Sequence, residues 1–257
     1  MLARWPLLLS LSLLACGPST APVTPAPAPR VSAAAIAPAP VPATQRPIPI
    51  APAAAVTARA DAIHARAAAV EPSVTLELIE LAKSLDGEMI KLEHRLKTKA
   101  SIERKLSSRM LEKGKTLGDV VIDDALRYTM RIDDRPPGRY VEGVEKTLAA
   151  LEAAGHRVIR LKNYWPTDDN YSGINCVLET PDGLLWELQF HTAASLEAQH
   201  ETRDMYEELR LDTTPVARKR ELFDAMTAIW AKVPIPVGVL GEAPLHPRAE
   251  RIDRPRP

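Results

Sequence analysis

The positions of its prolines confine the fold of this chain to its middle. The sequence has 257 residues and 24 prolines. Eleven prolines lie between residues 17 and 56, six lie from 234 onward, and only six lie between 57 and 233. Proline lacks a backbone N–H and disrupts helix interiors and central strands, so the two flanks are poor candidates for a packed core. The sequence therefore predicts one folded domain at 58–233, which is long enough to bury a core.

The first 16 residues are typical of a leader sequence. Arg4 precedes an apolar run that is too short to span a bilayer but suits a secretory signal. The run ends in Leu-Leu-Ala-Cys at 13–16, which resembles the cleavage site of bacterial lipoproteins. Cys16 is thus the predicted lipidation site, and the protein is expected at a membrane of the cell envelope, outside the cytoplasm. The alternative is an ordinary signal peptide and a secreted protein.

Two further segments are predicted to lie outside the domain. Residues 17–57 form a Pro/Ala-rich tether, whose Ala-Pro alternation favours an extended polyproline conformation. Residues 234–257 form a Pro/Arg-rich tail that is expected to be disordered. Cys176 is the only cysteine besides Cys16, so no internal disulfide framework is expected.

Hydrophobic spacing divides the central domain into helices and strands. Apolar residues follow a helical period over 78–96, 102–110 and 141–151, and two more helices are expected at 192–211 and 216–233. Strands are expected at 120–132, 158–164, 174–179 and 184–190, and the last two flank a Pro-Asp-Gly turn. Ser101 is the expected cap of the second helix. This order predicts an α/β (α+β) domain with a mixed sheet flanked by helices.

Basic residues concentrate in one short segment. The chain has 33 basic and 33 acidic residues, and this balance argues against a role based on nucleic-acid binding. Between 95 and 115, however, eight bases stand against two acids: Arg95, Lys97, Lys99, Arg104, Lys105, Arg109, Lys113 and Lys115. Such a cluster at the start of a helix suits a polyphosphate. A solvated basic helix face is the alternative.

Acidic residues on expected strands form a second cluster. The two-residue period of 184–191 places Glu187 and Gln189 on the face opposite Trp186. Asp123 and Asp124 enter the strand that carries Arg127. Two carboxylates that meet across a sheet suit Mg²⁺, which takes one or two carboxylates together with substrate phosphates. An exposed face with surface ion pairs would show the same pattern.

A third cluster combines aromatic and basic residues on a loop. Lys162 precedes Tyr164 and Trp165, and Tyr171 lies on a glycine-containing loop. An aromatic side chain in this setting stacks on a nucleobase, although a residue that only packs the loop would look the same.

Taken in order, these clusters resemble the motifs of RelA/SpoT-type alarmone synthetases. The matching segments are R-L-K-T-K-A-S-I-E-R-K at 95–105, D-A-L-R-Y at 124–128, K-N-Y at 162–164, Y-S-G-I-N at 171–175 and E-L-Q-F-H-T at 187–192. The resemblance extends over about residues 78–210, which is nearly the whole predicted domain. It implies a nucleotidyltransferase-like synthetase fold and pyrophosphoryl transfer from ATP to the 3′-hydroxyl of a purine nucleotide.

The resemblance also implies a role for each matching residue. Asp124 and Glu187 would hold Mg²⁺ and would be the catalytic residues, with Asp123 as a competitor for the position of Asp124. The nucleotide-binding residues implied are Arg95, Lys97, Ser101 and Lys105 for the ATP phosphates, Tyr171 for the acceptor base, Arg127, Lys162 and Gln189 for the acceptor phosphates, and Asn175 and His191 at matching motif positions.

The chain departs from the family pattern at four positions. The family's aspartate usually lies five residues before its arginine, where this chain has Ile122. The other three departures lie in the later motifs. Asn175 replaces a histidine, His191 replaces an arginine, and Gly173 replaces a serine. These variants resemble a divergent branch with secreted and toxin-like members, and they leave open whether the acceptor carries guanine or adenine. Two other hypotheses remain open from the sequence: a non-catalytic, nucleotide-binding envelope lipoprotein with this fold, and an envelope protein of unrelated function.

Overall fold

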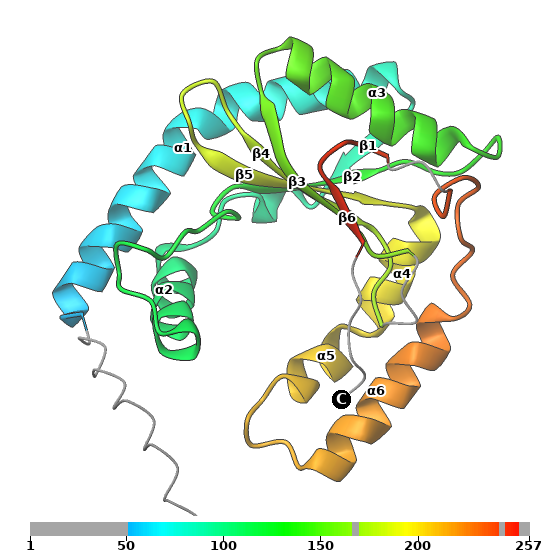
Figure 1. Ribbon diagram of the computed structural model, residues 1–257. Helices are drawn as coiled ribbons and strands as arrows, with labels where there is room; N and C mark the ends of the chain where they lie inside the picture. Colours follow the sequence, from blue (N-terminus) through cyan, green and yellow to red (C-terminus); the bar gives the residue numbers. More distant parts are fainter. Residues whose placement is uncertain (1–50, 166–169, 242–244, 252–257) are drawn as a thin grey trace, which may run out of the picture. The chain divides into compact units, whose positions relative to one another are not determined.

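The structure, a computed structural model, describes residues 51–165, 170–241 and 245–251 (Figure 1). The predicted signal peptide with Cys16 and most of the predicted tether lie outside these ranges, so those predictions stay untested. Within the described ranges, no helix has both the length and the apolar character needed to cross a membrane.

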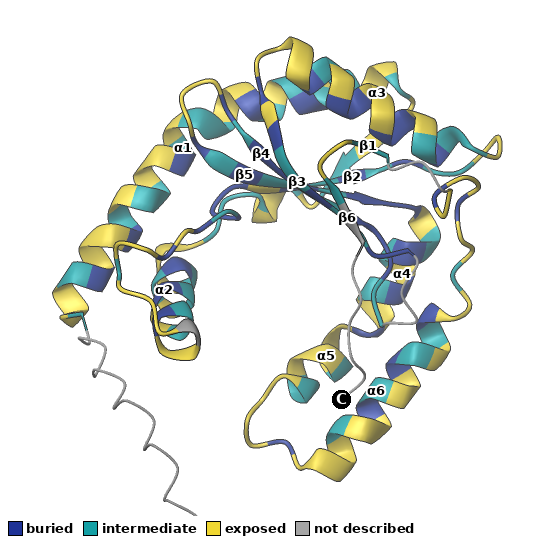
Figure 2. Ribbon diagram, in the orientation of Figure 1, coloured by how far each residue is buried: buried dark blue, intermediate teal, exposed yellow. Residues whose placement is uncertain are grey.

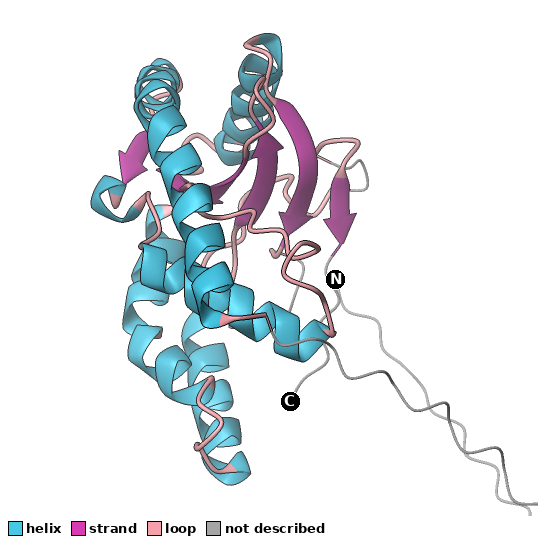
Figure 3. Cartoon of the chain, turned by 90° about the vertical axis from the view of Figure 1, so that its left-hand side faces the viewer, coloured by secondary structure: helices cyan, strands magenta, loops and turns pink. Residues whose placement is uncertain are grey.

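The described part of the chain forms six strands, six α-helices and one 3₁₀-helix. The elements are α1 (Ala53–Ser84), β1 (Glu88–Ile90), the 3₁₀-helix η1 (Leu92–His94), α2 (Lys99–Lys113), β2 (Arg127–Arg131), α3 (Arg139–Ala153), β3 (Arg157–Asn163), β4 (Ile174–Glu179), β5 (Leu185–His191), α4 (Ala193–Glu201), α5 (Arg203–Leu209), α6 (Val216–Trp230) and β6 (Ala249–Arg251). The strands described make one mixed sheet in the order β1-β2-β5-β4-β3-β6, seen from the side in Figure 3. The predicted fold class is confirmed.

The two faces of this sheet differ in character. One face carries large apolar side chains such as Trp186, Leu188 and Phe190, all fully buried, and the helices α1 and α3 lie over it (Figures 1 and 2). Tyr128 packs edge-on against Trp186, with 5.9 Å between the ring centroids. Because side chains alternate along a strand, the opposite face receives the polar residues of the same strands. We call this the polar face; Glu187 lies on it.

The first predicted helix ends earlier than its apolar spacing indicates. Helix α1 stops at Ser84, and the chain then turns into β1, which pairs antiparallel with β2. Gly87 lies at this turn, where an added Cβ would come within 3.0 Å of the Arg131 carbonyl oxygen. The spacing continues past the turn because β1 and η1 also place apolar side chains against the core.

The strand predicted at 120–132 is also shorter than expected. Only Arg127–Arg131 form β2, and Asp123 and Asp124 belong to the irregular segment before it. The predicted helix at 192–211 is divided in two at Thr202, which ends α4 and begins α5.

Two predicted boundaries, one at each end of the domain, differ from those in the structure. Helix α1 begins at Ala53, inside the predicted tether. The tail predicted to be disordered is ordered in its described parts, because Val239 is buried in the core and β6 pairs in parallel with β3. The backbone carbonyl of Val239 also accepts a hydrogen bond from Asn163, 2.9 Å long.

Candidate active site

Backbone hydrogen bonds bring three separate segments together at one edge of the polar face. The amide of Lys97 donates to the Ala125 carbonyl at 2.9 Å, and the amide of Arg127 donates to the Arg95 carbonyl at 2.8 Å. The amide of Glu187 donates to the carbonyl of Leu126, the next residue of the same segment, at 3.0 Å. The basic segment, the Asp-containing segment and the Glu-containing strand are therefore held side by side.

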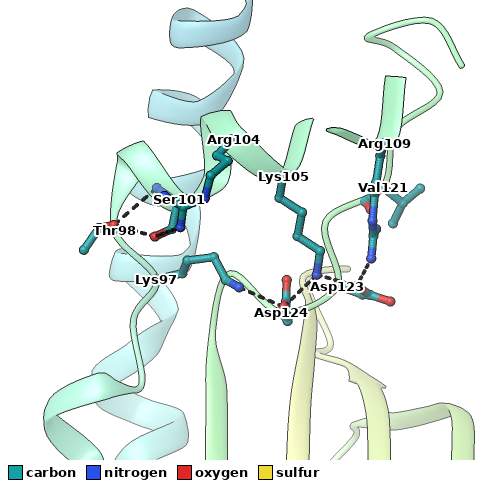
Figure 4. Close-up of polar contacts among 9 residues, drawn as sticks. All are labelled: Lys97, Thr98, Ser101, Arg104, Lys105, Arg109, Val121, Asp123 and Asp124. Carbon is teal, nitrogen blue, oxygen red and sulfur yellow. Dashed lines mark hydrogen bonds and ion pairs between the residues drawn. The ribbon is translucent and has the colours of Figure 1, made fainter. Parts of the chain in front are cut away.

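Two lysines converge on Asp124 (Figure 4). Lys97 Nζ lies 2.9 Å and Lys105 Nζ 2.7 Å from the same oxygen, Asp124 Oδ2. Burial alone would raise the pKa of Asp124, but the charges and hydrogen bonds of Lys105 and Lys97 outweigh it, and the pKa lies below its ordinary value. Asp124 is therefore ionised at neutral pH.

The other oxygen of Asp124 has a different environment. Asp124 Oδ1 is buried and has no hydrogen-bond partner among the described residues. An unpaired buried carboxylate oxygen is costly, which makes it the natural place for a cation. Both oxygens of Asp123 are occupied, by Arg109 at 3.3 Å and by Arg160 at 2.9 Å. Of the two aspartates that compete for the metal-binding role, only Asp124 therefore has an oxygen that is free to bind a metal ion.

Glu187 shares one cavity with these residues. The cavity has a volume of about 150 Å³ and is lined by Lys105, Arg109, Asp123, Asp124, Arg160, Lys162, Tyr164, Asn175, Val177 and Glu187. Burial raises the pKa of Glu187, and the negative charge of Asp124 adds to this effect, whereas Arg127 and Gln189 counteract it. A carboxyl group with a raised pKa and an ionised carboxylate therefore lie in the same pocket, an arrangement suited to proton transfer beside a metal ion.

The pocket fits a metal ion only together with a substrate. Among the described residues, no group of three or more His, Cys, Asp or Glu side chains is arranged to hold a metal. Asp124 and Glu187 supply two carboxylates, and Mg²⁺ commonly takes one or two carboxylates plus phosphate oxygens and water. The unpaired Asp124 oxygen agrees with such a site.

A buried hydrogen-bonded chain adjoins the cavity through Asn175, which lines it. The Tyr171 hydroxyl donates to Asn175 Oδ1 at 2.7 Å and lies 3.1 Å from His191 Nε2. His191 Nδ1 lies 3.0 Å from Ser195 Oγ. Burial, followed by the charge of Lys91, lowers the pKa of His191 to about 3, so its imidazole is neutral at physiological pH.

Tyr171 is already packed against other rings. Its ring meets those of Tyr164 and His191 edge-on, with centroid distances of 5.2 and 5.4 Å. Trp230 of α6 lies 5.8 Å away in a tilted arrangement. Both interpretations drawn from the sequence, a loop-packing residue and a stacking platform, are thus compatible with its position.

The cavity lining contains Lys105, Asp124, Lys162, Asn175 and Glu187 of the expected site residues, but not Arg95, Lys97, Ser101, Arg127, Tyr171, Gln189 or His191. Three of these seven have clear reasons for their absence. Arg95 turns toward α1, where its guanidinium pairs with Glu71 and donates to the Leu92 carbonyl. Ser101 is not the helix cap: Thr98 caps α2 by accepting a hydrogen bond from the Ser101 amide at 3.3 Å. His191 is fully buried and neutral, so it offers no positive charge to a ligand.

Two arginines that line the cavity were not expected there. Arg109 lies one helical turn after Lys105, so the helical period of the basic segment was a signal for it. Arg160 lies two residues before Lys162 on β3 and therefore on the same face of the strand. Their shared partner, Asp123, is held in place by both.

The comparisons with known proteins find likeness in structure only. No family model and no curated protein matches the sequence. A GTP pyrophosphokinase family protein from Streptococcus pneumoniae is similar over 63% of this chain and 83% of its own, with 16% identity and a TM-score of 0.45. A type VI effector in complex with its immunity protein is similar over 70% and 95%, with 19% identity and a TM-score of 0.43. Small alarmone synthetase 1 from Bacillus subtilis, bound to its product pppGpp, is similar over 62% and 82%, with 18% identity and a TM-score of 0.40.

These solved structures include synthetases of the kind that the sequence motifs resemble.

Proposed function

We propose that this protein transfers the pyrophosphoryl group of ATP to the 3′-hydroxyl of a purine nucleotide. One observation carries the proposal: Asp124 is held between two lysines with one buried oxygen unpaired, in the same cavity as a glutamate of raised pKa. Phosphoryl-type transfer requires cations around the transferring group, a metal site and a base near the nucleophile. The basic residues and the two carboxylates at this cavity support these roles.

The transfer forms one bond and breaks one. The acceptor's 3′-oxygen attacks the β-phosphorus of ATP, the bond from that phosphorus to the α,β-bridging oxygen breaks, and AMP leaves. Glu187 takes the proton of the attacking hydroxyl, a role that its raised pKa suits. Lys97 and Lys105 neutralise charge on the phosphate oxygens, and Asp123 fixes Arg109 and Arg160 at the wall of the cavity.

The cofactor proposed for this pocket is Mg²⁺. Asp124, through Oδ1, and Glu187 would hold it together with phosphate oxygens of ATP. When bound, the ion would neutralise charge that develops on the transferring group and align it with the acceptor. Lys97 and Lys105 already keep Asp124 ionised, as a metal ligand must be.

Label transfer tests this function. The full-length chain is incubated with ATP labelled at the γ-phosphorus, Mg²⁺ and each purine nucleotide in turn, and labelled acceptors are separated by chromatography. We expect transfer by the wild type and a loss of at least 100-fold in Asp124→Asn and Glu187→Gln. Glu145→Gln, at an exposed position on α3, makes the same chemical change far from the cavity and should leave the rate unchanged.

A second candidate function is nucleotide binding without turnover. Two observations favour it: Arg95, an expected phosphate ligand, is paired with Glu71, and His191, at the position of the family's arginine, is neutral and buried. ATP is also scarce outside the cytoplasm, where the Cys16 leader would place the protein. Nucleotide binding with no labelled product would support this second candidate. A protein that neither binds nucleotides nor forms a labelled product would exclude both candidate functions.

A further inference from the structure

We propose that His191 and Ser195 are positioning residues, which act through Tyr171 to hold the side-chain amide of Asn175 with its N–H groups toward the cavity. Ser195 lies outside every motif noted in the sequence. The inference deepens the proposed function, on which its consequence for ligand binding rests. We call the side chains of Ser195, His191, Tyr171 and Asn175, in this order, the relay.

The relay joins two strands, a helix and a loop. Asn175 lies on β4, His191 ends β5, Ser195 lies in the first turn of α4, and Tyr171 precedes β4. His191 and Ser195 both have an exposed fraction of 0%. Thr192 caps α4, and its backbone amide donates to Ser195 Oγ at 3.0 Å. Because polar groups buried this deeply need partners, the imidazole and the hydroxyl must satisfy each other.

Bond lengths and proton counts set the direction of the relay. Tyr171 Oη lies 2.7 Å from Asn175 Oδ1, which is typical of an O–H donor and shorter than most N–H···O bonds. The single proton of Tyr171 is thus used, so at the contact of 3.1 Å His191 Nε2 has to donate. A neutral imidazole carries one N–H group, so His191 Nδ1 accepts from the Ser195 hydroxyl at 3.0 Å.

The neutral imidazole that this order requires is present. Burial, followed by the charge of Lys91, lowers the pKa of His191 to about 3. The ion pairs that histidines form within the described ranges involve His94, His156 and His246 instead. Each nitrogen of the His191 ring therefore has one fixed role, as donor or as acceptor.

The relay ends at the wall of the cavity. Asn175 lines the cavity, and because its Oδ1 accepts from Tyr171, its Nδ2 remains as a donor. No described residue accepts a hydrogen bond from Nδ2. Lys162, which also lines the cavity, is the register partner of Asn175 on β3. An N–H donor beside a lysine suits an anionic oxygen, such as that of a phosphate, whereas a reversed amide would present its carbonyl oxygen and repel it.

The tautomer of His191 shows the direction of the relay without any turnover. It is read by nuclear magnetic resonance of the full-length chain with isotope-labelled histidine, and the His191 signals are identified by their loss in His191→Gln. We expect the ring proton on Nε2 and no second proton between pH 8 and pH 5. Tyr171→Phe, which keeps the aromatic ring, identifies the same signals by shifting them should His191→Gln fail to fold.

The opposite direction would give the opposite tautomer. Ser195 would then donate to the Thr192 carbonyl oxygen, 3.1 Å away, and His191 Nδ1 would carry the ring proton. Tyr171 would donate to the ring, and the carbonyl oxygen of Asn175 would face the cavity. A ring proton on Nδ1 therefore overturns the inference.

Nucleotide binding tests whether the relay acts through Asn175. The dissociation constants of ADP and GDP are measured by calorimetry for the full-length chain. Tyr171→Phe and Ser195→Ala should each weaken binding about 3- to 10-fold, but less than about 2-fold in an Asn175→Ala background. Tyr206→Phe, which removes the hydroxyl of an exposed tyrosine on α5, should change binding in neither background. An equal loss in both backgrounds would overturn the positioning role and leave the relay a contribution to folding alone.

These outcomes separate the inference from the proposed function. A ring proton on Nδ1 overturns the inference even if label transfer succeeds. A ring proton on Nε2, with a loss of binding that depends on Asn175, supports the inference even if no transfer is ever detected. Failure of both ADP and GDP to bind overturns the role of the Asn175 donor, whatever the tautomer.

Discussion

Gly173 leaves less room for a side chain than any other glycine that the structure describes. An added Cβ would lie 2.8 Å from His191 Cε1, 3.1 Å from His191 Nδ1 and 3.1 Å from the Phe190 carbonyl oxygen. Ordinary contacts of a Cβ begin near 3.4 Å. We therefore expect Gly173→Ala to displace the imidazole of His191, because the Phe190 carbonyl belongs to β5 and cannot move alone.

The size of the effect follows from what holds the imidazole. Ser195 and Tyr171 each lie within hydrogen-bonding distance of it, and a hydrogen bond typically contributes about 1 kcal/mol. Overpacking of a core costs about 1–3 kcal/mol. Gly173→Ala should thus lower the free energy of unfolding by about 2–3 kcal/mol, equivalent to roughly 5–10 °C in Tm for a domain of this size.

Urea unfolding followed by circular dichroism measures this change. Gly118→Ala is the matched control, because its Cβ would meet nothing closer than Thr116 Oγ1 at 3.8 Å, and its effect should stay within about 0.5 kcal/mol. In a His191→Ala background the cost of Gly173→Ala should fall by about half or more, since the clash with the ring is gone. A Gly173→Ala protein as stable as the wild type, or an equal cost in both backgrounds, would refute the reasoning.

Three further predictions concern charge and modification. Lys105→Ala should lower stability by about 1–2 kcal/mol and raise the pKa of Asp124. A carboxyl pKa that is lower in the folded than in the unfolded state stabilises the fold at neutral pH, and this contribution is lost as pH falls through the folded-state pKa. Since the variant has a higher folded-state pKa of Asp124, its acid unfolding should begin at higher pH. An unchanged pH midpoint of acid unfolding would contradict this prediction. Glu187 has a raised pKa, so its contribution to stability is present at low pH and is lost as pH rises through the folded-state pKa. Glu187→Gln should therefore raise Tm at pH 8 but not at pH 4. Equal shifts of Tm at both pH values would refute the raised pKa. Labelled palmitate should enter the wild type and Cys176→Ser but not Cys16→Ser, and label in Cys16→Ser would exclude the lipoprotein prediction.

The strands at the centre of the sheet were predictable because their pattern is local. The period of two in β5 separates Trp186 from Glu187, and the structure places the first in the core and the second at the cavity. The hairpin between β4 and β5 was predictable from its turn residues, since Gly183 adopts a positive φ of 83°. The motif resemblance implied that Lys97, Lys105 and Asp124 serve one site, and the two lysine nitrogens lie 2.9 and 2.7 Å from Asp124 Oδ2.

Other features depend on contacts between residues far apart in sequence. Nothing near Arg95 in the sequence indicates that Glu71 pairs with it. The imidazole of His191 packs against Gly173, which lies before β4 and 18 residues away in the sequence. Strand β6 is only three residues long and forms because β3 offers it an edge, so local proline content gave the wrong result for the tail. The unpaired oxygen of Asp124 could not be foreseen, because it depends on which oxygen the two lysines contact.

The most direct test of the central claim is the identity and stoichiometry of the products. With Mg²⁺, ATP and a purine nucleotide, mass spectrometry should find AMP and an acceptor carrying a new 3′-diphosphate in equal amounts. Both should disappear together in Asp124→Asn and on chelation of the metal. Release of ADP and free phosphate instead, or a product unaffected by Asp124→Asn, would contradict the account.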